Sequence, residues 1–232
     1  MPGLAGATYG QGDYGNATAR TSALDPNPAA PKYSIALWMV AGTAPANNVY
    51  VWGVADAANP DRSGITLHVH RNLLEFYCQT SVTRQVSELY WDLQAGRWTH
   101  SVVTWDGARN VLYVNGRAVQ HVANVQAVDV AGTRCAFIAT GCGDDTTGML
   151  RVFDMRIFPD TALNPAEARA AMDPRINFDP ARCKGRYARY FWAPVASGKM
   201  YDESGNGNDL TLAGTAAQCA SCEEPPWRKA LW

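Results

Sequence analysis

The sequence predicts an all-β protein folded as an antiparallel jelly-roll sandwich. Hydrophobic residues make up 47% of the 232 residues and charged residues 18%, which is enough apolar side chain to form a buried core. From Tyr33 onward, short runs rich in β-branched and aromatic residues are separated by turn residues, as in a sandwich or barrel. Several runs alternate apolar and polar side chains, which is the period of a strand with one buried face. All-β sandwiches often reach this length as a single domain.

The expected strands follow one another closely along the chain. They are YSIALWMV (33–40), VYVWGVA (49–55), GITLHVH (64–70), LLEFYCQ (73–79), WTHSVVTW (98–105), NVLYVNG (110–116), RAVQHV (117–122), RCAFIAT (134–140) and MLRVFDMRIF (149–158). In the third run, Ile65, Leu67 and Val69 share one face of the strand. His68 and His70 share the other, which indicates a solvated polar face, with a transition-metal site as the alternative.

Turn chemistry joins two of these runs. Asn115 and Gly116 stand between strand-like segments, and both residue types tolerate the positive φ of a type I′ hairpin turn. Two late runs, at 186–195 and 208–214, are also strand-like and flank the loop DESGNGN (202–208). We expect residues 186–214 to complete the sheets of the same domain.

One helix is expected after the main strands. Asn164 can cap it, Pro165 suits its first turn, and Glu167 stands at the capping-box position. Asp173 and Pro174 end it, because the residue before a proline is disfavoured in helical geometry.

The chain therefore divides into three parts. Residues 1–31 are rich in Gly, Ala, Pro and Asn without clear periodicity, and we expect an extended N-terminal arm. Residues 32–214 form the jelly-roll domain, and residues 215–232 form a C-terminal tail. The formal net charge is -1 and no basic stripe stands out, so neither nucleic acid nor a membrane is an expected partner.

Six cysteines are present: Cys78, Cys135, Cys142, Cys183, Cys219 and Cys222. The N-terminus has neither the basic region nor the apolar run of a signal peptide. We therefore expect reduced, buried thiols or a local Cys219–Cys222 bridge. A zinc site that also uses Cys135 and Cys142 is the alternative, although that pair is widely spaced for zinc.

Four segments, taken in order, resemble the concanavalin A-like, laminin-G-like jelly rolls. They are YSIALWMV, GRWTHSVVTWDGARNVLYVNGRAV, TTGMLRVFDMRIFPDTALNPAEARAAM and DESGNGNDLTLAG. In most relatives the SGNGN loop precedes the first of these strands, whereas here it follows all the others. Because the termini of such sandwiches tend to lie close together, a circular shift would put the loop in the same place.

The resemblance raises the question of glycan hydrolysis, since some relatives are glucanases. Those enzymes carry an E-x-D-x-E run that points three carboxylates into one cleft, and this sequence has none. Glu88 and Asp92 have the wrong spacing, and no serine nucleophile elbow is present. The sequence therefore predicts that the chain is not an enzyme.

The resemblance also implies a calcium site, because many relatives hold Ca²⁺ with loop carboxylates and carbonyls. Calcium takes six to eight oxygen ligands from flexible loops. The candidate ligands are Asp144, Asp145, Asp202, Asn206 and Asn208. The alternative is that these Asp-, Asn- and Gly-rich loops are turn chemistry alone.

Other family positions favour structural roles. Asp154 matches a family acid that alternation can place inside the sheet as a hydrogen-bonding group. His100 and the tryptophans Trp38, Trp98 and Trp105 fall on the family's core strands.

The remaining tryptophans are less fixed by the pattern. Trp192, Trp227 and Trp232 are the candidates for stacking on a sugar or anchoring in a partner's pocket. Trp52 and Trp91 are also left unassigned by the family pattern.

The leading hypothesis is a non-enzymatic virion surface component, such as a phage capsid decoration or tail protein. Laminin-G-like domains without signal peptides resemble those found in phage structural proteins. The expected partners are other virion proteins or further copies of the chain, and the expected location is the virion. The alternative is a calcium-dependent carbohydrate-binding module that leaves the cell by a signal-less route.

Overall fold

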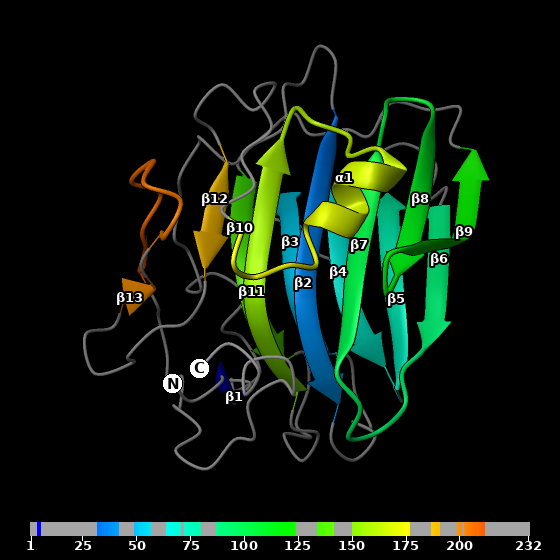
Figure 1. The fold of residues 1–232 in the computed structure, drawn as a ribbon, viewed down its shortest axis with the longest axis horizontal. Helices are drawn as coiled ribbons and strands as arrows, with labels where there is room; N and C mark the ends of the chain where they lie inside the picture. The colour runs from blue at the N-terminus through cyan, green and yellow to red at the C-terminus, as the bar shows by residue number, and fades with distance from the viewer. Residues whose placement is uncertain are drawn as a thin grey trace.

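The computed structural model describes about half of the chain as ordered strands, turns and one helix. The described residues are 4–5, 32–41, 49–56, 64–70, 72–79, 87–123, 134–141, 150–176, 187–190, 199–200 and 202–211. Two antiparallel sheets lie one behind the other, and a short helix covers the front of the first (Figure 1). This is the predicted sandwich.

The front sheet has seven strands in the order β1-β11-β2-β7-β8-β9, with β12 also paired to β11. Their bounds are β1 Leu4–Ala5, β2 Tyr33–Ala41, β7 Thr99–Trp105, β8 Arg109–Val114, β9 Arg117–Ala123, β11 Leu150–Pro159 and β12 Ala188–Tyr190. β1, near the N-terminus, and β12, which follows the helix, thus both pair with β11.

The rear sheet has five strands in the order β10-β3-β4-β5-β6. Their bounds are β3 Val49–Asp56, β4 Gly64–His70, β5 Leu73–Gln79, β6 Ser87–Asp92 and β10 Arg134–Gly141. β13 (Lys199–Met200) and β14 (Leu210–Thr211) pair with each other as a separate ribbon. The sequence did not predict β1, β6 or β13. Of the late runs expected at 186–195 and 208–214, the described strands cover only the short segments β12 and β14, whereas the bounds of the other main strands agree within two residues.

The core between the sheets follows the predicted alternation. Ile35, Leu37 and Met39 of β2 are fully buried, as is Leu67 of β4. The ring of Tyr33 bridges the sheets: its centroid lies 5.8 Å from that of Trp105 and 6.2 Å from that of Phe76 on β5. Large aromatic side chains therefore fill one end of the sandwich.

The outer face of the front sheet is also buried, because α1 (Pro165–Ala170) lies across it (Figure 1). A second apolar cluster joins the helix to the sheet; its members include Ala36, Val102, Tyr113, Phe158, Leu163, Ala168, Ala171 and Tyr187. The rings of Phe158 and Tyr187 stack with centroids 4.9 Å apart. A helix this short depends on such packing, since isolated single turns are unstable.

The predicted capping box begins the helix. Asn164 Oδ1 accepts the backbone N–H groups of Ala166 and Glu167, both at 3.0 Å. Glu167 Oε2 accepts the N–H of Asn164 at 2.8 Å. The predicted hairpin is present as well: Asn115 and Gly116 have φ values of 48° and 77°, as a type I′ turn requires.

Candidate functional site

The centre of the polar structure is a bulge in β11. The pairing of β11 with β2 shifts register between Phe153 and Arg156. Asp154, inside the bulge, has a φ of 47°, in the left-handed region that aspartate enters more readily than most residues. The bulge interrupts strand alternation and leaves the Asp154 carboxylate 1% exposed.

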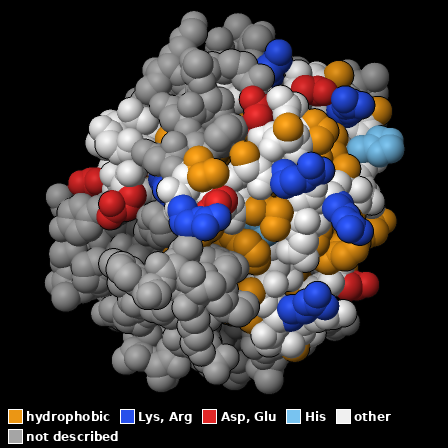
Figure 2. All heavy atoms as spheres, viewed as in Figure 1, with side chains coloured by type: hydrophobic (Ala, Val, Ile, Leu, Met, Phe, Trp, Pro, Cys, Tyr) orange, Lys and Arg blue, Asp and Glu red, His pale blue; other side chains and the backbone are white. Residues whose placement is uncertain are grey.

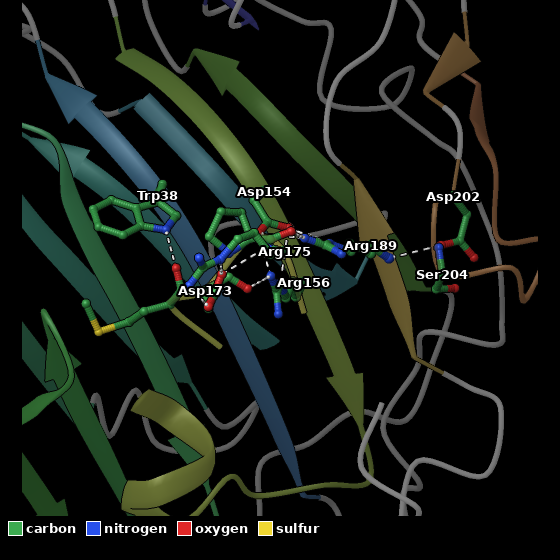
Figure 3. A network of polar contacts seen from close by, with 10 residues as sticks. Trp38, Asp154, Arg156, Asp173, Arg175, Arg189, Asp202 and Ser204 are labelled. Atoms are coloured by element: carbon green, nitrogen blue, oxygen red, sulfur yellow. Dashed lines mark hydrogen bonds and ion pairs between the residues drawn. The ribbon is translucent and has the colours of Figure 1, made fainter. Parts of the chain in front are cut away.

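Two arginines share this carboxylate (Figure 3). Arg156 Nε and Nη2 lie 3.1 and 2.6 Å from Asp154 Oδ1 and Oδ2. Arg189 Nε and Nη2 lie 2.7 and 3.1 Å from the same two oxygens. Asp154 therefore has the hydrogen-bonding role inside the sheet that the sequence favoured. Both of its oxygens are committed to forked guanidinium contacts, which are strong and directional.

The same arginines hold the chain that follows α1. Three consecutive carbonyls, at residues 172–174, accept from Trp38 Nε1, Arg156 Nη2 and Arg189 Nη2 in turn. The donors come from β2, β11 and β12. Backbone carbonyls away from water need hydrogen-bond partners, and these side chains supply them, so the segment that follows α1 is fastened to three neighbouring strands.

Asp202 extends the network into the loop at 202–208. Its Oδ1 accepts the backbone N–H groups of Arg189 and Ser204, and its Oδ2 accepts that of Asn208, all at 2.9 Å. Both carboxylate oxygens thus shape the loop and join it to β12.

The other polar side chains of this loop meet at one carbonyl. Tyr187 O accepts Ser204 Oγ at 2.9 Å, Asn206 Nδ2 at 2.8 Å and Asn208 Nδ2 at 3.4 Å. The hydroxyl of Tyr190 donates to Asn208 O at 2.7 Å. The loop is therefore organised by bonds within the chain, and calcium binding by Asp202, Asn206 and Asn208 stays a prediction.

The fold has known relatives. Residues 10–169 match a laminin G family model described as the concanavalin A-like lectin/glucanases superfamily. The chain belongs to this superfamily. The match begins within the expected N-terminal arm and ends within α1. β12 and the 202–208 loop lie beyond it. No curated protein sequence matches the chain.

Solved structures similar to this concanavalin A-like chain include binding domains of bacterial neurotoxins. The botulinum neurotoxin serotype G binding domain has a TM-score of 0.53 and 16% identity over 65% of this chain and 38% of that one. The receptor binding domain of botulinum neurotoxin D has a TM-score of 0.50 and 16% identity over 60% and 36% of the two chains. This chain thus spans little more than a third of those domains, and the likeness shows the fold alone.

Five of the predicted site residues lie outside the described part of this concanavalin A-like domain: Asp144, Asp145, Trp192, Trp227 and Trp232. Within the described part, no group of three or more His, Cys, Asp or Glu side chains is arranged to hold a metal ion. Nor is any helix in that part long and apolar enough to cross a membrane.

His100 is buried beneath the helical region. Its ring centroid is 5.2 Å from that of Trp38. Burial, and then the charge of Arg156, lower the pKa of His100 to about 3 against a weaker opposing effect of the Ala171 backbone. The neutral imidazole is therefore a structural part of this face, as the sequence predicted.

The expectation of a solvated face on β4 was wrong for His68. This residue is 4% exposed, and its Nε2 lies 2.6 Å from Glu75 Oε2 on β5. The two residues stand directly opposite each other in the ladder. Alternation alone gave no reason to expect this contact, because the partner lies on another strand.

At one edge of the sandwich, β6, which the sequence did not predict, lies beside β9, which it did. Tyr90 and Trp91 of β6 are 49% and 38% exposed, and Val119 of β9 is 37% exposed. The Tyr90 N–H donates to Gln120 Oε1 of β9 at 2.7 Å, which closes the gap between the sheets. The run SELYWD (87–92) carries the Leu, Tyr and Trp content of a strand, and that was the available signal.

Proposed function

We propose that this chain is a non-enzymatic binding domain. The observation that carries the proposal is that three carboxylates of the described residues are engaged in structural hydrogen bonds and ion pairs. Asp154 is shared by two arginines, Asp202 accepts three backbone N–H groups, and Glu167 closes the capping box. A glycosidase instead needs two carboxyl groups facing the scissile bond across a cleft.

The lowered pKa values of two other carboxyls, those of Asp173 and Asp106, support the same proposal. The Arg175 guanidinium lowers the pKa of Asp173. Burial raises the pKa of Asp106, but the N–H groups of Ala108 and Arg109 and the Arg109 side chain outweigh it, so the net pKa is lowered. A general acid needs the opposite shift.

Two assays on the full chain test this proposal together. A glycan array, read with calcium and again with a chelator, reports binding, and release of reducing ends from soluble polysaccharides reports hydrolysis. We expect no hydrolysis. Turnover of any polysaccharide that is lost on heat denaturation would overturn the proposal.

The proposed setting of this binding domain is a virion surface, where a sandwich would act as an attached subunit. Support comes from the resemblance to phage structural proteins and from β1, near the N-terminus, which pairs with β11 of the sandwich. Mass spectrometry and gold labelling of purified particles, with the free protein as control, test the setting. Absence of the chain from intact particles would overturn it.

A calcium-dependent carbohydrate site is the second candidate. Its support is the oxygen-rich chemistry of Asp144 and Asp145 together with the ordered loop at Asp202. Calcium titration by calorimetry should give binding in the wild type and a large loss in the Asp144→Asn/Asp145→Asn double variant. Asp106→Asn is the matched control, since that carboxylate accepts the backbone N–H groups of Ala108 and Arg109 in its own turn. Equal binding by all three proteins would exclude these ligands.

A further inference from the structure

The chain contains two Asn-Gly pairs, and they lie in different surroundings. Asn115-Gly116 forms the turn between β8 and β9, and Asn206-Gly207 lies in the loop at 202–208. In such a pair the backbone nitrogen of the glycine can attack the side-chain carbonyl carbon of the asparagine, because glycine has no Cβ to shield that nitrogen. The reaction closes a succinimide ring, which water then opens to aspartate or isoaspartate.

This reaction needs no reagent except water. The bond from the glycine nitrogen to asparagine Cγ forms, the bond from Cγ to Nδ2 breaks, and the glycine amide proton leaves with Nδ2 as ammonia. Hydrolysis of either ring carbonyl then gives a free carboxylate. Before the attack, the asparagine side chain must turn towards the following nitrogen, because reacting atoms need a close and aligned approach. Every hydrogen bond that holds the side chain elsewhere therefore opposes the reaction.

The Asn115 side chain is held by β7. Asn115 Oδ1 accepts the backbone N–H of His100 at 3.0 Å, and Asn115 N donates to His100 O at 2.8 Å. His100 is 1% exposed, so turning the Asn115 side chain would take the acceptor from an N–H of a buried residue, which is costly. The turn is also covered, because Gly116 is buried and a Cβ there would lie 2.8 Å from Met172 Sδ.

The Asn206 side chain is held by a bond that the loop can lose. Asn206 Nδ2 donates to Tyr187 O at 2.8 Å. Ser204 Oγ and Asn208 Nδ2 donate to the same oxygen at 2.9 and 3.4 Å. A carbonyl oxygen has two lone pairs, so this one stays satisfied when the Asn206 amide turns away. Gly207 is exposed, and a Cβ on it would meet nothing within 4 Å, which leaves room for the attack.

Exposure of the asparagine itself does not separate the two pairs, since Asn115 and Asn206 are both exposed. Their surroundings do separate them. On the side of the molecule where Figure 1 draws the loop in orange, the space-filling view shows acidic and uncharged polar atoms at the surface (Figure 2). The turn at 115–116 lies instead against Met172, just after α1.

We propose that Asn206 is a site of spontaneous deamidation and that the fold protects the same dipeptide at Asn115. The two rates should differ by about tenfold or more, because only the reaction at Asn115 first leaves a buried backbone group without its acceptor. This inference goes beyond the proposed function, since the reaction requires neither a virion nor a bound ligand.

The product changes the loop. A carboxylate at position 206 places an acceptor, in place of a donor, against the carbonyl oxygen of Tyr187. It also adds a negative charge to a segment that already contains Asp202 and Asp209, which are joined by a bond from Asp202 N to Asp209 Oδ1 at 2.9 Å. The isoaspartate product in addition lengthens the backbone by a methylene group. Residues 202–208 should therefore open more often in the deamidated chain.

The test is ageing of the full chain in mildly alkaline buffer made with water enriched in heavy oxygen, followed by digestion in acid and peptide mass spectrometry. The heavy oxygen marks conversions that occur during ageing. In the folded chain, the peptide with Asn206 should gain the label faster than the peptide with Asn115 by about tenfold or more. In guanidinium chloride the two rates should be similar, because neither side chain is then held.

Asn206→Gln is the matched variant, because its extra methylene keeps the amide from closing a succinimide ring. It should stop labelling of that peptide, which assigns the reaction to Asn206 rather than to Asn208, two residues further on. Label that persists in the variant, or equal rates at the two pairs in the folded chain, overturns the proposal.

The effect on the loop has its own measurement. The aged chain can be separated from the fresh chain by its added negative charge, and hydrogen exchange of the two forms can be compared. Exchange at residues 202–208 should be faster in the aged form, whereas exchange in β2 and β7 should be unchanged. Equal exchange of the loop in both forms would overturn the inferred opening.

Discussion

The guanidinium of Arg189 lies against the carboxylate of Asp154, with Nε 2.7 Å from Oδ1 and Nη2 3.1 Å from Oδ2. This contact joins β12, after the helix, to the bulge of β11, before it. Arg156 holds the same carboxylate. The three side chains are between 0% and 5% exposed. Removing one member of such a buried ion pair leaves uncompensated charge, and that is costly.

Asp154→Asn should therefore lower the free energy of unfolding by about 3–5 kcal/mol. The amide keeps the shape of the carboxylate but leaves two guanidinium charges without a counter-ion. Urea denaturation measures the loss. Asp106→Asn is the control, because its ion pair with Arg109 is 40% and 62% exposed, and pairs of that kind contribute about 0–1 kcal/mol. Equal losses in the two variants would show that the buried network does not stabilise the fold.

His100 makes stability depend on pH. Its pKa is about 3 in the folded state and 6.5 in the unfolded chain. Between these values the unfolded state takes up a proton that the folded state does not, so the free energy of unfolding falls as pH falls from 6.5 towards 3. The slope from this group reaches about 1.4 kcal/mol per pH unit.

His100→Gln should flatten this dependence, because the replacement does not titrate. Denaturation curves of the two proteins at several values from about pH 6 down to pH 4.5 give the two slopes. This window lies above 3.8, where Asp106 and Asp173, whose pKa values are also lowered, begin to add to acid destabilisation. If the slopes of variant and wild type coincide, His100 is not the group responsible.

The parts of the fold that the sequence predicted correctly depend on neighbours along the chain. The Asn164 cap and the Asn115–Gly116 turn are set by residues within one turn, and the core strands by alternation over a few positions. The bulge at Asp154 and the pair of His68 with Glu75 depend instead on strands that meet only in the folded sheet. Local patterns carry no information about those partners.

The candidate site shows the same division. The sequence singled out Asp202, Asn206 and Asn208 by residue type, but hydrogen bonding to Arg189 and Tyr187 depends on how β12 docks. β6 was missed because its exposed Tyr90 and Trp91 blur the alternation of an edge strand.

Asn164→Ala tests the cap directly. The variant loses the acceptor for two backbone N–H groups and should lower the free energy of unfolding by about 1 kcal/mol. Thermal or urea unfolding gives the value. Glu203→Ala, at an exposed loop position, should change it by less than about 0.5 kcal/mol. A cap variant as stable as the loop variant would mean that packing alone holds α1 in place.

Alanine substitutions at two glycines, Gly116 and Gly205, distinguish the cost of backbone strain from the cost of a steric clash. Gly116 and Gly205 have φ values of 77° and 87°, where any side chain costs about 1–2 kcal/mol. A Cβ at Gly205 would meet nothing within 4 Å, whereas one at Gly116 would lie 2.8 Å from Met172 Sδ and 3.3 Å from Arg169 Cγ. Gly116→Ala should therefore lower the free energy of unfolding by more than Gly205→Ala does.

The Gly116→Ala variant should lose less stability when Met172 is also replaced by Ala. The steric contact at Gly116 involves the Met172 thioether, whereas the φ strain does not. Urea denaturation of the two single variants, of Met172→Ala and of the Gly116→Ala/Met172→Ala double variant gives the coupling directly. Additive losses would place the whole cost of Gly116→Ala in the backbone. A clear coupling would show that the hairpin turn and the helix end press together, so that the turn positions α1 as well as joining β8 to β9.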